Sequence, residues 1–135
     1  MNKYMLSDIA KFINGELYGN DMIVSNFSID SRTIRKDDVF ICIKGKKYDG
    51  HDFISHCIKK ASCLITSKEI TDINLEEKSY IKVNDTLKAL QELSRFARSK
   101  SKAKFIAITG SNGKTTVKEM IAHILSDYKI CYTRG

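Results

Sequence analysis

The sequence contains no proline, no internal repeat and no low-complexity segment, so nothing in its 135 residues indicates a disordered region. It also lacks an apolar run near the roughly 18 to 20 residues that a membrane span needs. At the N-terminus the apolar residues are soon interrupted by Asp8 and Lys11, which argues against a signal peptide. We therefore expect one ordinary domain or two small ones, located in the cytoplasm and without a membrane span.

Cysteine and histidine are scarce, and they form no recognisable disulfide or metal pattern. There is no C-x-x-C pair, and no cysteine has a histidine at metal-ligand spacing. We interpret the four cysteines as reduced, small apolar side chains. They are Cys42, Cys57, Cys63 and Cys131. His56 and His123 are interpreted as surface or helix-packing residues.

Acidic residues are outnumbered, with 16 against 23 basic ones, which gives a net charge of +7. Such a charge permits binding to nucleic acid, to a membrane surface or to a phosphorylated small molecule. The densest basic cluster contains one aromatic residue, Phe96, and lacks the interleaved rings of a nucleic-acid surface. We interpret it as a solvated helix end and linker, and expect no nucleic-acid partner. The cluster comprises Arg95, Arg98, Lys100, Lys102 and Lys104.

Residues 1–83 alternate between helical and strand-like patterns, which predicts a small α/β domain. Apolar residues at helical spacing predict a helix over residues 6–13, with Ser7 as its cap and Gly15 as its stop. A second helical pattern covers residues 53–61. Four apolar segments predict strands, at residues 23–29, 39–43, 63–66 and 80–83.

The remainder of the chain predicts a connecting helix and then the start of a nucleotide-binding sheet. Asp85 caps a helical pattern that ends in a charged connector, which assigns residues 84–102 to a helix and linker. An apolar strand at residues 105–109, a glycine loop, a helix and a strand at residues 129–133 follow. We interpret residues 103–135 as the truncated opening of an ATP-binding domain.

The glycine loop carries the residue types that bind nucleoside triphosphates. Glycines let the backbone approach phosphates, and the N-terminus of the following helix favours an anion. Lys114 is predicted to contact the β- and γ-phosphates of ATP as the catalytic residue, and Thr115 to ligate Mg²⁺. Ile108 stands where the usual longer loop has its first glycine, so this loop is shortened. The predicted ATP-binding residues are Gly110, Ser111, Asn112, Gly113, Lys114, Thr115 and Thr116.

The shortened loop, T-G-S-N-G-K-T-T at residues 109–116, resembles the ATP site of the Mur ligases and of the related folylpolyglutamate synthetases. The sequence K-E-M at residues 118–120 resembles the branch of the Mur ligases that adds D-alanyl-D-alanine. D-S-R at residues 30–32, K-G at 44–45 and D-G-H-D-F at 49–53 resemble the uridine-nucleotide-binding domain of the same family.

The resemblance implies the N-terminal portion of an ATP-dependent ligase of peptidoglycan synthesis, monomeric at full length. UDP-N-acetylmuramoyl-tripeptide would be activated as an acyl phosphate and attacked by the amine of D-alanyl-D-alanine. Residues 1–83 would bind the UDP substrate. The residues implied to do so are Ser31, Arg32, Lys44, Gly45, Asp49, Gly50, His51 and Asp52.

Two alternatives remain open: the neighbouring branch of the family that extends the dipeptide precursor, and a non-catalytic module that binds a nucleotide or UDP-sugar. From the residues alone, the segment 30–32 fits a turn with an ion pair. Residues 49–51 fit a hairpin or a helix-entry turn, with Asp52 as helix cap. We expect the 135-residue chain by itself to form no peptide bond.

Overall fold

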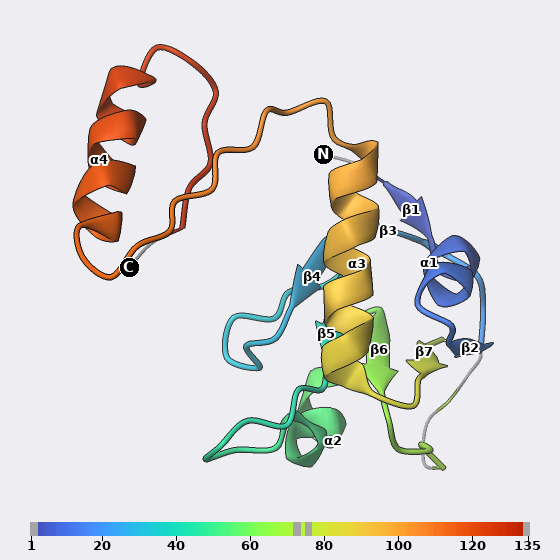
Figure 1. The fold of residues 1–135 in the computed structure, drawn as a ribbon. Helices are drawn as coiled ribbons and strands as arrows, with labels where there is room; N and C mark the ends of the chain where they lie inside the picture. Colours follow the sequence, from blue (N-terminus) through green and yellow to red (C-terminus); the bar gives the residue numbers. More distant parts are fainter. Residues whose placement is uncertain (1–2, 72–73, 75–76, 134–135) are drawn as a thin grey trace. The chain divides into compact units, whose positions relative to one another are not determined.

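The computed structural model describes residues 3–71, 74 and 77–133 and divides the chain into two units, Met1–Ser101 and Lys102–Gly135. The first unit is an α/β fold around a five-stranded sheet (Figure 1). In the second, the described residues contain one helix, α4 (Lys114–Ile124). Among the helices of the described residues, none has the length and apolar character needed to cross a bilayer.

The main sheet is mixed, with a parallel middle and one antiparallel edge. Its strand order is β2-β7-β6-β5-β4, and only the β2–β7 pair is antiparallel. Two further short strands, β1 and β3, form a separate antiparallel pair. The strands are β1 Tyr4–Met5, β2 Glu16–Tyr18, β3 Ile23–Val24, β4 Asn26–Ser28, β5 Asp38–Ile41, β6 Cys63–Thr66 and β7 Ser79–Lys82.

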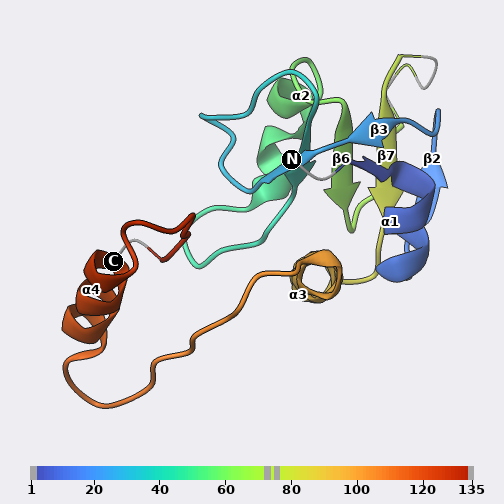
Figure 2. The same ribbon diagram turned by 90° about the horizontal axis from the view of Figure 1, so that it is seen from above.

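Helices cover both faces of the main sheet, which explains the unbroken apolar runs of its central strands. In β5, Val39 and Ile41 belong to the core cluster that includes residues of α1 (Leu6–Phe12) and α3 (Thr86–Lys100). The alternate residue Phe40 belongs to the opposite cluster, with Cys57 of α2 (Ile54–Cys57). Figure 2 shows α2 and α3 on opposite sides of the sheet.

The ends of α1 show how distant residues complete a helix. The predicted cap was wrong: the N-cap position is Met5, and the N–H of Ser7 donates to the carboxylate of Asp21 at 2.9 Å. A side chain from elsewhere in the chain therefore satisfies a free amide of the first turn. At the other end the Gly15 N–H donates to the carbonyl of Ala10 at 2.8 Å, which ends the helix beside the predicted stop.

Asp85 caps α3 as predicted, since its carboxylate accepts the N–H groups of Leu87 at 2.8 Å and Lys88 at 3.0 Å. The helix runs to Lys100 and buries Leu93 against the first core cluster. The helix that we expected to link two domains thus packs into the core of the first unit.

Two further predictions in the first unit need adjustment, and two strands were missed. The segment 23–29 is divided, because β3 pairs with β1 whereas β4 pairs with β5. The helical pattern at 53–61 is realised as a short 3₁₀ helix, η1 (Gly50–Phe53), followed by α2. The short strands β1 and β2 were not predicted. The strands at 39–43, 63–66 and 80–83 are present within one or two residues of their predicted bounds.

The second unit differs from the prediction in its strands. Residues 105–109 and 129–133 form no strand, although the helix between them is present. Strand formation requires a hydrogen-bonded partner, and these two segments line a common pocket without pairing. Most of their apolar side chains stay exposed, including Phe105 and Ile106. The predicted strands were therefore wrong for this structure.

Candidate functional site

The motif-bearing loops of the first unit follow neighbouring parallel strands. Residues 30–32 lie just after β4, residues 44–52 follow β5, and Ser67 and Lys68 follow β6. The carboxyl ends of adjacent parallel strands meet at one edge of a sheet, where open α/β folds bind ligands. The fold therefore gathers the D-S-R and D-G-H-D-F motifs at this edge.

Arg32 is held by a bidentate ion pair within its own turn. Its Nε donates to Asp30 Oδ1 at 2.9 Å and its Nη2 to Oδ2 at 2.7 Å. These bonds lower the pKa of the Asp30 carboxyl to about 2. The Arg32 side chain is 85% exposed. Since a guanidinium carries five N–H donors, the exposed part of the group keeps donors for an anion.

The segment after β5 is a narrow hairpin with a basic tip. Lys44 and Asp49 form an antiparallel bridge, and the Gly45 N–H donates to the carbonyl of Tyr48 at 2.8 Å. Gly50, which follows Asp49, packs so closely that a Cβ there would lie 2.7 Å from the backbone nitrogen of Ile43. A glycine is needed at this position because any side chain would push the hairpin away from β5.

His51 connects the hairpin to the loop after β6. Its Nδ1 lies 2.5 Å from Asp49 Oδ1, and its Nε2 accepts the N–H of Ser67 at 3.2 Å. The Ser67 hydroxyl lies 3.0 Å from the same Nε2. Accepting a backbone N–H requires an unprotonated Nε2, so Nδ1 carries the proton that is donated to Asp49. His51 is only 8% exposed, and both ring nitrogens are engaged inside the protein.

Asp49, and not Asp52, organises the hairpin. Its carboxylate accepts the N–H of His51 at 3.0 Å and caps η1, so the predicted capping role of Asp52 was wrong. The hydrogen bonds from the His51 N–H and ring lower the pKa of Asp49. Lys68 Nζ lies 3.7 Å from the second carboxylate oxygen. Sequence reasoning missed Lys68 and Ser67, although their position directly after a buried strand could have identified them.

The remaining predicted residues of this edge lie at its surface. Ser31 is half-buried in the turn with Arg32, Lys44 and Gly45 are exposed in the hairpin, and Asp52 is exposed on η1. The site in the first unit thus has an accessible basic part and a buried supporting part. The buried part is the set of contacts made by His51.

The glycine loop of the second unit leads directly into α4. Gly113 is the N-cap residue with φ 75°, a left-handed conformation that favours glycine, and no side chain caps the helix. The first amides of α4, those of Lys114, Thr115 and Thr116, lack intrahelical acceptors, as in any α-helix. Lys114 Nζ donates to the Gly110 carbonyl at 2.5 Å, across the loop. Free amides, a helix N-terminus and a lysine therefore converge as an anion site requires.

A pocket of about 420 Å³ lies beside this loop, within the second unit. Lys114 and Thr115 line it from the helix. The segments before the loop and after the helix complete it. Its lining residues are Ile106, Ile108, Lys114, Thr115, Lys118, Cys131, Tyr132 and Thr133. The pocket therefore contains the residues predicted to contact the terminal phosphates and Mg²⁺.

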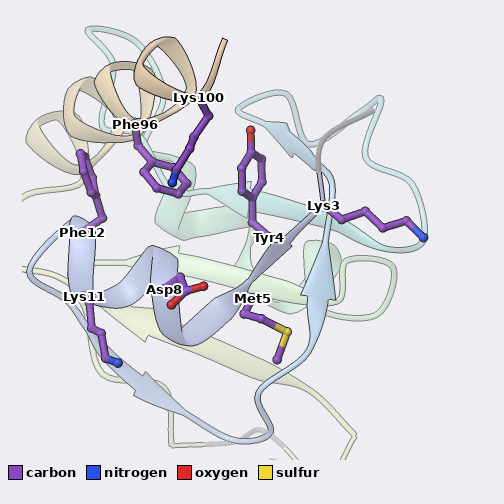
Figure 3. A pocket seen from close by; sticks show the side chains of 8 residues that line it. All are labelled: Lys3, Tyr4, Met5, Asp8, Lys11, Phe12, Phe96 and Lys100. Carbon is purple, nitrogen blue, oxygen red and sulfur yellow. The ribbon is translucent and has the colours of Figure 1, made fainter. Parts of the chain in front are cut away.

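A larger and shallower pocket, of about 820 Å³, lies in the first unit and contains none of the predicted site residues (Figure 3). Three rings tilted against one another line it, with Phe96 4.7 Å from Phe12 and 5.2 Å from Tyr4 between ring centroids. Lys100 Nζ lies 5.7 Å from the centre of the Phe96 ring. The aromatic residues here contact one another, as core residues do.

Two family models match the chain. The model described as "Mur ligase family, catalytic domain" covers residues 23–98, and the model described as "Mur ligase middle domain" covers residues 108–135. The chain is 42% identical over 121 residues to a UDP-N-acetylmuramoyl-tripeptide–D-alanyl-D-alanine ligase of Buchnera aphidicola, which covers 89% of this chain and 26% of the relative. It is 45% identical over 105 residues to a UDP-N-acetylmuramoyl-L-alanyl-D-glutamate–2,6-diaminopimelate ligase of Clostridium perfringens, covering 76% and 21%.

Solved structures give the same result for the fold. A crystal structure of MurF from Acinetobacter baumannii matches with a TM-score of 0.82 and 29% identity, over 94% of this chain and 28% of that one. A MurF ligase of Thermotoga maritima, solved in complex with ADP, matches with a TM-score of 0.66 and 30% identity, over 77% and 24%. The chain spans about a quarter of the length of the relatives that it matches. The two family models together account for most of its residues, and the chain belongs to the Mur ligase family.

Proposed function

We propose that this chain is the N-terminal portion of an ATP-dependent ligase that joins D-alanyl-D-alanine to UDP-N-acetylmuramoyl-tripeptide. The observation that carries the proposal is the alignment of the D-S-R and D-G-H-D-F loops at the carboxyl ends of β4 and β5. A ligand site is expected at such an edge. The similarity to the Buchnera aphidicola ligase, whose name states this reaction, supports the choice of substrate.

In this proposal residues 1–83 bind the UDP substrate, residues 84–102 are the helix and linker between the two domains, and residues 103–135 begin the ATP-binding domain. The protein acts in the cytoplasm. Arg32 and the exposed Lys44 supply cations for the diphosphate. Ser31, Gly45, Gly50 and Asp52 shape the surrounding backbone and surface. Asp49 and His51 support these residues, because their hydrogen bonds fix the hairpin to the loop after β6.

The glycine loop is the proposed ATP site. Bound ATP with Mg²⁺ would supply the phosphoryl group that activates the substrate carboxylate. Lys114 would exchange its bond to the Gly110 carbonyl for the terminal phosphates, and Thr115 would offer its hydroxyl to the metal ion. The amides from Ser111 to Thr116 would receive phosphate oxygens. The Thermotoga maritima relative in complex with ADP supports the choice of nucleotide.

The substrate proposal is tested by calorimetry with UDP-N-acetylmuramoyl-tripeptide. Arg32→Ala should weaken binding by about 1.5 to 3 kcal/mol, the usual value of a hydrogen bond to a charged group. Arg35→Ala is the matched control, because it removes the same charge from the same loop and should leave the affinity nearly unchanged. Equal affinity of wild type and Arg32→Ala would remove Arg32 from the site.

The ATP proposal is tested by titration of the chain with ATP and Mg²⁺. We expect weak binding that Lys114→Ala abolishes, because no residue described in the second unit is buried and ordering the loop on binding costs free energy. Lys129→Ala, an exposed lysine of the same unit, should bind as wild type does. A low-micromolar dissociation constant would contradict the expectation of weak binding.

A second candidate is the ligase branch that extends the dipeptide precursor. The 45% identity to the Clostridium perfringens diaminopimelate ligase favours it over part of the chain. The two branches differ in the length of the peptide on the UDP sugar. In the same calorimeter, tighter binding of UDP-N-acetylmuramoyl-dipeptide than of the tripeptide would favour this second candidate.

A further inference from the structure

Lys118 is unusually enclosed for a lysine of the second unit. Its side chain is 13% exposed, although no described residue of this unit is buried. The Nζ donates to the carbonyl of Thr133 at 2.7 Å and lies 3.0 Å from Glu119 Oε1. It also lies 5.7 Å from the centre of the Tyr132 ring. Three groups therefore hold this cation, and two of them belong to the segment after α4.

These contacts span the pocket beside the glycine loop. Lys118 stands one helical turn after Lys114, so both project from the same face of α4. Lys114 and Thr115 form one wall of the pocket, and Cys131, Tyr132 and Thr133 belong to another. A hydrogen bond from Lys118 to Thr133 joins these two walls. Among the residues that the structure describes, no strand pairing involves this segment.

The two lysines have different partners and so different parts to play. Lys114 donates to a carbonyl of the glycine loop itself, a bond that an incoming phosphate can replace. Lys118 is engaged by a carbonyl, a carboxylate and a ring, so its charge is already compensated. A compensated cation contributes little to attracting phosphate, but it can fix the position of the groups around it.

We propose that Lys118 is a positioning residue, which ties residues 131–133 to α4 and so forms the wall of the nucleotide pocket that faces Lys114 and Thr115. The identity of the ligand, a nucleoside triphosphate with Mg²⁺, rests on the function proposed above. The tie itself rests on the contacts of Lys118. Without Lys118, the segment would move freely, and the nucleotide would have to order it on binding.

The first experiment tests, without any nucleotide, whether Lys118 holds residues 131–133 against α4. Cys131 is exposed, whereas the other three cysteines are buried, so its alkylation by iodoacetamide reports on this segment alone. Mass spectrometry of the peptide that contains Cys131 gives the rate. Because the Cys131 thiol is already exposed, its rate reports on its surroundings. Lys118→Met should change the alkylation rate by about twofold or more, because the segment leaves its place beside α4. Lys129→Met removes the same charge from the same unit and should leave the rate unchanged. Equal rates for all three proteins would overturn the proposal.

The second experiment measures the effect on the ligand. Lys118→Met should weaken the affinity for ATP with Mg²⁺ by about tenfold, as expected for losing one charge-assisted hydrogen bond that organises the site. Lys118→Arg retains a cation that reaches the same carbonyl and should restore most of the affinity. In wild type, ATP should protect Cys131 from alkylation, and Lys118→Met should lose this protection.

The outcomes separate the two proposals. If wild type binds no ATP, the nucleotide function fails. The alkylation rates without nucleotide then still decide whether Lys118 holds residues 131–133 against α4. If wild type binds ATP and Lys118→Met binds equally and protects Cys131 equally, the positioning role is overturned while the nucleotide function stands. A loss of affinity that Lys118→Arg does not restore, together with unchanged alkylation rates, also overturns it.

Discussion

At the scale of single residues, several charged side chains in the loops after β4, β5 and β6 are paired with one another. Asp30 pairs with Arg32, and Asp49 contacts both the His51 ring and the Lys68 ammonium group. These contacts link residues of the loops that follow β4, β5 and β6. An arginine held by a carboxylate in this way is oriented before a ligand arrives, which lowers the cost of binding.

The Asp30 pair makes stability depend on acid pH. Because the pKa of Asp30 is lowered to about 2 in the folded protein, its ionised form stabilises the fold. This contribution is complete above the ordinary value of 3.8 and is lost as the pH falls through about 2. The urea midpoints of wild type and Asp30→Asn should therefore differ at pH 6 and converge near pH 2. Asp52→Asn serves as a control, and a difference that persists undiminished at pH 2 would contradict the assignment.

His51 should matter for stability although it lies among predicted ligand-binding residues. His51→Ala leaves the Ser67 N–H and the Asp49 carboxylate without their ring partner, which should cost about 1 to 3 kcal/mol of unfolding free energy. The exposed His56 is the matched control, since His56→Ala should change stability by no more than about 0.5 kcal/mol. Urea denaturation measures both. Equal stability of the two variants would mean that the His51 bridge contributes nothing.

At the scale of elements, the strands and the helices α1 and α2 are short and depend on groups outside themselves. α1 has seven residues and α2 has four, well below the length at which an isolated helix is stable in water. Their stability comes from burial against the sheet and, in α1, from a hydrogen bond to a carboxylate outside the helix. The carboxylate that caps α1 comes from Asp21, in a different segment of the chain.

The cap of α3 allows a direct measurement of such a contribution. Asp85→Ala removes the acceptor for the Leu87 and Lys88 amides and should destabilise the first unit by about 1 kcal/mol. Asp85→Asn should retain most of the stability, because the asparagine oxygen can accept the same bonds. Chemical denaturation followed by circular dichroism checks both variants. An alanine variant as stable as wild type would show that the cap is not needed once the helix is packed.

At the scale of the whole molecule, the two units differ in how much they bury. The first has core clusters on both faces of its sheet. In the second, the described residues are all exposed or half-buried, including the apolar residues Val117, Met120 and Ile124 of α4. Since burial of apolar area is the main source of stability, the second unit is held much less firmly.

Hydrogen exchange should report this difference directly. Amides of β5 and β6 should exchange slowly, at rates set by unfolding of the first unit, whereas amides of residues 103–133 should exchange within seconds to minutes. Exchange followed by peptide mass spectrometry resolves the two units in one sample. Protection in α4 equal to that in β5 would contradict the low stability inferred for the second unit.

The sequence by itself determined the features whose signals are local. The buried strands at 39–43 and 63–66 are apolar runs between turn residues, and Asp85 precedes a helical pattern that it caps. The glycine loop and the helix after it could also be read directly, because spacing within a few residues defines them. These patterns act through the backbone of their own segment, so no distant partner is required.

Tertiary structure decided what depends on partners far along the chain. β2 has three residues and exists because β7 offers it an edge, and the segment 23–29 is divided because β1 and β5 each pair with one part of it. Residues 105–109 have the composition of a strand but pair with no strand in the described part of the chain. The burial of His51 follows from the position of Ser67 at the end of β6. Pairing and burial are properties of the neighbour as much as of the residue, and only the folded chain specifies the neighbour.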